Sequence, residues 1–151
     1  DIPEFTSFLK RIYKYVDITK PSLDDCARIF SSELEPSEYA QLFIQWGAKI
    51  VIISMGADGC LLATAEGEEY LLFANPVSVV DVTGAGDAYW AGFLTALLAD
   101  KPPLEAARQG QAIAELKIKT LGPLTQLPGS EMLEKMIASV RYKKKPVVVK
   151  K

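Results

Sequence analysis

The stretch Asp81-Val82-Thr83-Gly84-Ala85-Gly86-Asp87 lies near the middle of the 151-residue chain and precedes a long helical pattern at residues 88–98. Two glycines one residue apart let the backbone turn tightly and approach a ligand closely, because neither carries a side chain. A helix that begins at such a turn directs unpaired N–H groups and a partial positive charge toward it, and anions bind there. Asp87 adds a carboxylate at the edge of this predicted anion site. A base that accepts a proton from a hydroxyl attacking a phosphate would explain that carboxylate.

The same seven residues resemble the anion-hole motif Asp-Thr-x-Gly-Ala-Gly-Asp of the PfkB (ribokinase-like) carbohydrate kinases. The matching positions are Asp81, Gly84, Ala85, Gly86 and Asp87. Val82 stands where the family has Thr, and Thr83 fills the variable position. An isolated Gly-x-Gly would favour a plain turn with Asp87 as a helix cap, but the full string favours the family.

Composition limits the classes of function. The chain fits one ordinary domain with a sizeable core, since 49% of its residues are hydrophobic. Its 17 basic and 19 acidic residues give a net charge of -2, which indicates no nucleic-acid partner. No apolar run is long enough to cross a membrane, and we expect no signal peptide. We expect Cys26 and Cys60 to be buried free thiols, which suits a cytoplasmic location. The absence of histidine excludes His-based triads, metal sites and general bases.

Helical periodicity and short apolar runs alternate along the chain, which predicts an α/β fold with a mostly parallel sheet. Helices are expected at residues 5–15, 23–31, 37–45, 88–98, 104–120 and 131–140. Strands are expected at residues 16–18, 49–54, 60–64 and 69–73, the last two as an antiparallel pair at the sheet edge. Ligands bind beyond the carboxyl ends of parallel strands, where we expect both glycine turns, 56–59 and 84–86, the second after the apolar stretch 76–80. The basic residues from 141 onward are expected to be frayed.

A second glycine turn resembles another family motif. Ser54-Met55-Gly56-Ala57-Asp58-Gly59 resembles the Thr-x-Gly-x-x-Gly turn that lies along the nucleotide, and Ser54 keeps the hydroxyl group. The resemblance implies that Ser54, Gly56 and Gly59 contact the nucleotide. Taken alone, the stretch would be a hairpin turn without a ligand.

A third stretch, Lys20-Pro21-Ser22-Leu23-Asp24-Asp25, resembles the family's Pro-Asn-x-x-Glu segment, which helps to place magnesium and phosphates. Here Ser22 replaces Asn and Asp25 replaces Glu. The resemblance implies that Ser22 lies near the nucleotide and Asp25 near Mg2+. A capped helix start explains the same residues equally well.

Residues 111–122 resemble the family helix that ends beside the adenine and a monovalent-cation site. The resemblance implies that Gln111 lies near the nucleotide. It also implies that a K+-like ion is held by the backbone at Gly122 together with Asp81 and Thr83. From the residues alone this segment is a helix that ends at a glycine.

The family implies phosphoryl transfer from ATP, with Mg2+ on its phosphates, to a hydroxyl of a small sugar substrate. Asp87 would be the base, and the N–H groups of Gly84, Ala85 and Gly86 would stabilise the transferring phosphate. We favour a fructokinase-like or 2-keto-3-deoxygluconate kinase-like role; an adenosine-type nucleoside kinase and a non-catalytic nucleotide-binding module are the alternatives. A Rossmann dinucleotide site is disfavoured, because Tyr89 occupies its third glycine position.

The resemblance covers residues 1–142 and only the second half of a family member, with residues 143–151 as a basic tail. A complete member is a three-layer α/β/α domain, so we expect the N-terminal half and its lid to be missing here. The isolated piece is then expected to have little kinase activity, and a homodimer of the full-length protein stays open.

Overall fold

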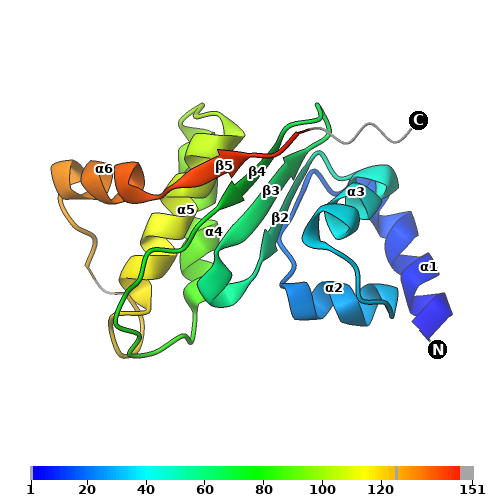
Figure 1. Cartoon of the computed structure of the whole chain (residues 1–151), viewed down its shortest axis with the longest axis horizontal. Helices are drawn as coiled ribbons and strands as arrows, with labels where there is room; N and C mark the ends of the chain where they lie inside the picture. The colour runs from blue at the N-terminus through cyan, green and yellow to red at the C-terminus, as the bar shows by residue number, and fades with distance from the viewer. Residues whose placement is uncertain (1, 125, 147–151) are drawn as a thin grey trace. The chain divides into compact units, whose positions relative to one another are not determined.

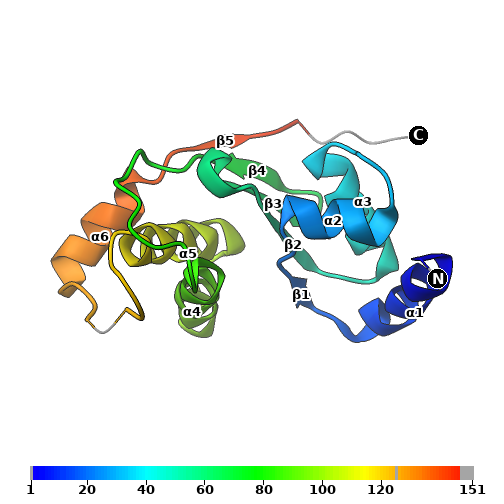
Figure 2. The same ribbon diagram turned by 90° about the horizontal axis from the view of Figure 1, so that it is seen from below.

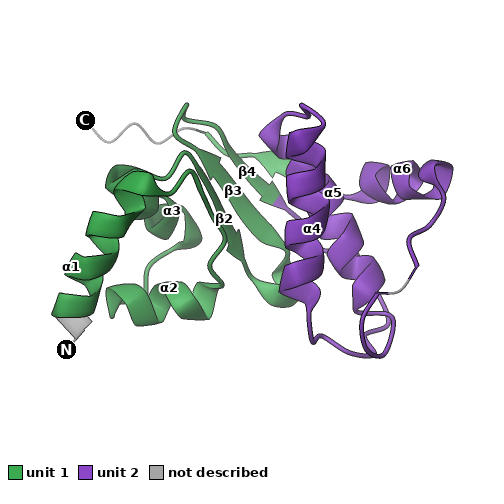
Figure 3. Cartoon of the chain, turned by 180° about the vertical axis from the view of Figure 1, so that it is seen from behind, with its two compact units in different colours: residues 1–71, 143–151 green, residues 72–142 purple. Residues whose placement is uncertain are grey.

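The apolar run predicted as a strand folds as β2, Ile50–Ser54, and its three central residues are buried. The structure is a computed structural model and describes residues 2–124 and 126–146. The chain divides into unit 1, residues 1–71 and 143–151, and unit 2, residues 72–142 (Figure 3). Among the described residues, no helix is both long enough and apolar enough to span a membrane.

Unit 1 holds most of the sheet and three α-helices (Figure 1). Its elements in chain order are α1 (Ile2–Ile12), η1 (Tyr13–Tyr15), β1 (Ile18–Thr19), α2 (Leu23–Phe30), α3 (Pro36–Trp46), β2, η2 (Gly56–Asp58), β3 (Cys60–Thr64), β4 (Glu69–Leu72) and β5 (Tyr142–Lys144). Leu72 and Tyr142 are the residues of β4 and β5 that belong to unit 2.

The sheet has the strand order β1-β2-β3-β4-β5. β2 pairs in parallel with β1 and antiparallel with β3, with Ile50 opposite Thr64 and Ser54 opposite Cys60. The α/β class is therefore confirmed, in a sheet with both kinds of pairing. Because β1 and β2 are parallel, their carboxyl ends lie at the same edge, which places the two following loops together.

The core of unit 1 lies where α3 packs on β2 and β3 (Figures 1 and 2). Tyr39, Phe43 and Trp46 recur at helical spacing along α3 and are buried. The Phe43 ring stacks on Tyr13 with centroids 5.0 Å apart and meets Phe30 edge-on at 5.2 Å. Burial of each such side chain stabilises the fold by about 1.5–3 kcal/mol.

The segment after Arg141 differs from the prediction. Residues Tyr142–Lys144 form β5 next to β4, so the expectation of a frayed segment is wrong for them. The expectation that residues 60–64 and 69–73 lie at the sheet edge is also wrong, because β5 occupies that edge.

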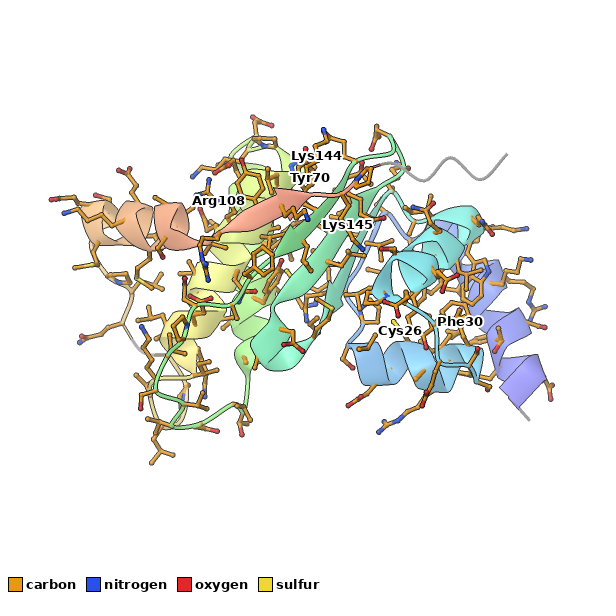
Figure 4. All side chains as sticks on the ribbon, in the orientation of Figure 1. Cys26, Phe30, Tyr70, Arg108, Lys144 and Lys145 are labelled. Atoms are coloured by element: carbon orange, nitrogen blue, oxygen red, sulfur yellow. The ribbon has the colours of Figure 1, made fainter. Side chains whose placement is uncertain are left out.

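Lysines hold β5 beside β4. The Lys145 N–H donates to the Glu69 carbonyl at 2.8 Å, and Lys144 Nζ lies 5.3 Å from the Tyr70 ring centroid (Figure 4). The ammonium groups also bind neighbouring side chains: Lys145 Nζ donates to Ser37 Oγ at 2.6 Å, and Lys144 Nζ pairs with Glu68 at 3.4 Å. A domain boundary at residue 142 stays a prediction, and residues 147–151 lie outside the described part of the chain.

In the residues of unit 2 that the structure describes, the helices are α4 (Ala85–Leu98), α5 (Pro103–Lys117) and α6 (Ser130–Ser139). α4 and α5 lie side by side (Figures 1 and 3). Their backbones come close at Gly92 and Gly110: a β-carbon on Gly92 would lie 2.9 Å from the Gln109 carbonyl oxygen, and one on Gly110 would lie 2.9 Å from that of Tyr89. Only glycine permits this approach.

The apolar stretch 76–80 is not a strand. The expectation that the second glycine turn follows the end of a strand is therefore wrong. Val79 and Val80 are 58% and 57% exposed. The N–H groups of Val80 and Asp81 both donate to the Ile118 carbonyl, at 2.7 and 3.2 Å. A strand needs a neighbouring strand to pair with, and within the described ranges this stretch has none. The helix predicted to residue 120 ends earlier, at Lys117.

Candidate active site

The turn before α4 has the geometry of an anion site. Gly84 caps the helix in the left-handed conformation, with φ at 77°, and α4 begins at Ala85. This φ disfavours any residue with a β-carbon, so the first glycine of the motif is required by the backbone. The first-turn N–H groups have no carbonyl partner four residues earlier within the helix, and they point toward the turn. Asp87 lies in that first turn and is exposed to solvent.

One predicted member of the anion hole has a partner already. The Ala85 N–H donates to the Val82 carbonyl at 3.1 Å. For Gly86 and Asp87, the structure shows no such bond to the preceding loop in the described part of the chain. Of the predicted set of Gly84, Ala85 and Gly86, the Ala85 N–H is therefore already engaged within the turn. The role of this set as a phosphate site stays a prediction.

Asp81 is the centre of a hydrogen-bonded junction in unit 2. Its Oδ1 accepts from the Thr83 N–H at 2.9 Å, and its Oδ2 accepts from the Gly122 N–H at 3.1 Å. Lys117 Nζ donates both to Oδ2 at 3.1 Å and to the Asp81 carbonyl at 2.9 Å. The Thr83 N–H and then the Lys117 ammonium hold the pKa of Asp81 well below its ordinary value of 3.8. The structure therefore brings together Asp81, Thr83 and Gly122, which the sequence predicted as neighbours.

Gln111 belongs to a separate polar cluster inside unit 2. Its side-chain amide donates to Glu115 at 3.0 Å, and both residues are buried. Glu115 also accepts from the Asn75 backbone N–H at 2.8 Å and from the Asn75 side chain at 3.0 Å. These bonds fasten the loop before the glycine turn to α5. A contact between Gln111 and a nucleotide stays a prediction.

In unit 1, Ser22 and Asp25 form a reciprocal helix cap. The Asp25 N–H donates to Ser22 Oγ at 3.1 Å, and Asp25 Oδ2 accepts from the Ser22 N–H at 3.1 Å and from Oγ at 2.6 Å. The hydrogen bonds from the Ser22 side chain and backbone lower the pKa of Asp25. The capped helix start is therefore present, and a role near Mg2+ stays a prediction.

The second glycine turn follows β2, as predicted. Gly56 and Gly59 have φ values of 59° and 94°, and the residues between them form the short helix η2. Ser54 pairs with Ser22 in an isolated parallel bridge, and the Ser54 N–H donates to the Pro21 carbonyl at 3.0 Å. The structure thus brings the predicted nucleotide residues Ser22 and Ser54 together at one edge of the sheet.

The described residues also bear on thiol chemistry and on metal binding by clustered side chains. Cys26 is fully buried, and that burial raises the pKa of its thiol to about 12, so it is not a nucleophile (Figure 4). No group of three or more Cys, Asp or Glu side chains gathers in a metal-binding arrangement within residues 2–124 and 126–146.

Two functional candidates were missed from the sequence, Lys117 and Glu115. Both are buried charged residues, 3% and 7% exposed, on a helix whose other buried positions are mostly small or apolar. Lys117 follows Gly110 and Ile113 at helical spacing, so it lies on the apolar stripe of α5. A lysine at such a position could have been identified from the sequence as a buried charge.

Most of the chain is similar to known carbohydrate kinases. A model described as pfkB family carbohydrate kinase matches residues 2–129. The chain is 35% identical over 130 residues to the ATP-dependent 6-phosphofructokinase of Thermoanaerobacterium thermosaccharolyticum, a match that covers 85% of the chain and 39% of that enzyme. It is also 35% identical over 151 residues to the aminoimidazole riboside kinase of Salmonella typhimurium, covering 92% of the chain and 44% of that enzyme.

Solved structures agree with these sequence matches. Aminoimidazole riboside kinase from Salmonella enterica, complexed with aminoimidazole riboside and an ATP analog, is 30% identical with a TM-score of 0.73; the match covers 92% of this chain and 48% of that one. Ribokinase from Thermotoga maritima is 29% identical with a TM-score of 0.75, over 85% of this chain and 44% of that one. The chain therefore has a ribokinase-like fold and spans less than half the length of these relatives.

Proposed function

Since the chain belongs to the pfkB family of carbohydrate kinases, we propose that it carries the phosphate-transfer half of an ATP-dependent sugar kinase. The reaction moves the γ-phosphate of ATP to a sugar hydroxyl. The bond between the γ-phosphorus and the bridging oxygen of ADP breaks, a bond to the sugar oxygen forms, and the hydroxyl proton passes to a base.

The observation that carries this proposal is the turn at the start of α4. Gly84 in the left-handed conformation starts the helix, and the first-turn N–H groups would stabilise the charge that develops on a phosphate bound at this turn. Asp87 is exposed in the same turn and is free to take the hydroxyl proton. A base and an anion site in one turn of one helix match the needs of phosphoryl transfer, which depends on positioning and charge stabilisation.

ATP and Mg2+ would engage the loops of unit 1. The bridge between Ser22 and Ser54 brings two hydroxyl-bearing residues to the sheet edge, beside the turn that starts at Gly56. Asp25 is exposed at the start of α2, with Oδ2 engaged by Ser22. Mg2+ retains several waters and is bound through few carboxylates, so Asp25 would hold it through water while the metal neutralises phosphate charge.

A fructokinase-like or 2-keto-3-deoxygluconate kinase-like acceptor is the favoured substrate. Relatives with matching sequence are named as kinases of sugar derivatives and of nucleosides, so the acceptor is a hydroxyl compound of one of these kinds. A nucleoside kinase is the second candidate, because a ribose-bearing riboside is bound in a structural relative of 30% identity. A non-catalytic nucleotide-binding module is the third.

An acceptor panel tests the proposal on the longest natural protein that contains these residues. ATP turnover is measured with fructose, fructose 6-phosphate, 2-keto-3-deoxygluconate, ribose and adenosine, and product is identified by mass. Formation of ADP and a phosphorylated acceptor in equal amounts supports the proposal. Nucleotide binding by calorimetry without phosphorylation of any acceptor would favour the non-catalytic module.

A further inference from the structure

We propose that the ammonium group of Lys117 occupies the place of a monovalent cation beside Asp81, so that this protein needs no K+ at that junction. The inference deepens the proposed function, since it concerns the loop that begins the predicted anion site. It replaces the expectation that Asp81, Thr83 and Gly122 hold a K+-like ion.

The oxygen atoms of Asp81 already accept hydrogen bonds from the protein. A metal ion at this junction would need the free oxygen atoms of Asp81. Lys117 Nζ already takes two of them, the carbonyl at 2.9 Å and Oδ2 at 3.1 Å. The Thr83 N–H donates to Oδ1 at 2.9 Å, and the Gly122 N–H shares Oδ2 with the lysine at 3.1 Å, so both carboxylate oxygens are already engaged by donors. The residues present therefore do not fit an added cation.

Burial strengthens the argument. The Lys117 side chain is 4% exposed and that of Asp81 is 18% exposed, so water screens the pair poorly. A second positive charge placed beside the ammonium would be repelled, and displacing the lysine would leave its charge buried without a partner. An ammonium and K+ carry the same single charge, so one lysine satisfies the electrostatic need of the carboxylate.

The lysine also supports the catalytic turn. A β-carbon on Gly84 would lie 3.9 Å from Lys117 Cε, so the lysine stem lies next to the helix-capping glycine. Lys117 is the last residue of α5, where a helix terminus favours positive charge. Lys117 is thus a positioning residue that ties the Asp81–Gly84 loop to α5 without an exchangeable ion.

The first test uses the unmodified chain and does not depend on kinase activity. Melting temperature is measured in KCl and in tetramethylammonium chloride at equal ionic strength, and Tl+ binding is followed by thallium NMR as a probe for K+ sites. We expect the same melting temperature in both salts and no saturable Tl+ binding. A K+-specific rise in melting temperature, or saturable Tl+ binding, would overturn the inference.

Three variants extend the test. Lys117→Ser should melt roughly 5–10 °C lower in tetramethylammonium and recover part of that loss in KCl, since the vacated space admits K+. Lys117→Met keeps the stem without the charge and should melt lower in both salts. Lys119→Ser, an exposed lysine two residues on, is the matched control and should not change. If KCl does not raise the melting temperature of Lys117→Ser, the inference is wrong. These melting temperatures do not depend on whether the acceptor panel identifies a sugar substrate.

Discussion

Gly92 of α4 lies against Gly110 of α5, so closely that a β-carbon on Gly92 would come within 3.0 Å of the Gly110 α-carbon. The obstacle is backbone rather than the end of a flexible side chain, so the two helices must separate to admit a methyl group. This contact fixes the helix that carries Asp87 against the helix that carries Lys117.

Gly92→Ala should therefore lower the free energy of unfolding by about 1–3 kcal/mol, the usual effect of overpacking. Urea denaturation followed by circular dichroism measures the change. Gly129→Ala is the control, since its β-carbon would meet no atom within 4 Å. Gly129 is the N-cap of α6, where Ala is less favourable than Gly, so its effect should stay below about 1 kcal/mol. Equal effects of the two substitutions would contradict the close approach of the helices.

Removal of the Glu115 carboxylate should also destabilise unit 2. Glu115→Ala leaves the Asn75 N–H and the Gln111 amide without their acceptor, which costs about 1–3 kcal/mol. Glu131→Ala removes an exposed carboxylate paired with Lys135 and should cost no more than about 0.5 kcal/mol. Denaturant titration of both variants measures the difference, and a neutral Glu115→Ala would refute the role of the cluster.

Stability should fall in acid in a manner that depends on Asp81. Its pKa is lowered in the folded state, so its contribution is complete above the ordinary value of 3.8 and is lost as the pH falls toward the folded value. The free energy of unfolding should therefore decline with falling pH below about 5, and Asp81→Asn should flatten that slope. Asp24→Asn, at an exposed carboxylate, is the control. An unchanged slope in Asp81→Asn would show that the Asp81 junction does not form.

Asp87→Asn should reduce phosphoryl transfer by roughly 10²–10⁴-fold, because the base is removed while the first-turn N–H groups remain. Nucleotide affinity, measured by calorimetry, should change little. Asp100→Asn removes a carboxylate just beyond the other end of α4 and should leave transfer unchanged. Turnover is measured with the acceptor that the sugar panel identifies, and near-normal turnover by Asp87→Asn would exclude Asp87 as the base.

Much of the fold was predictable because its signals are local. A capped helix start was one of the two interpretations of Ser22, and Ser22 does cap α2. The helix expected at residues 37–45 ends at Trp46, and the apolar run before Ser54 is a buried strand. Each of these depends on a few neighbouring residues whose preferences agree with the fold.

The wrong predictions concern segments whose structure depends on contacts with residues far away in the sequence. Two of the three residues 142–144 are lysines and the segment lacks an apolar pattern. It forms a strand because β4 supplies the pairing edge. Residues 76–80 have strand composition but no strand to pair with among the described residues. In the candidate site, the turn at Gly84 followed from its glycines, whereas the use of Lys117 in place of a cation depends on α5 meeting Asp81. Such contacts between segments about 36 residues apart carry no local signature.

The position of β5 has a consequence for the order in which the protein is made. Unit 2 is one continuous insert, and unit 1 is completed by residues that follow it. A ribosome therefore releases the whole helical insert before it releases the edge strand that covers β4. Until then the β4 edge is unpaired and open to association with another chain, and the lysines at positions 143, 144 and 145 end this exposure as they emerge.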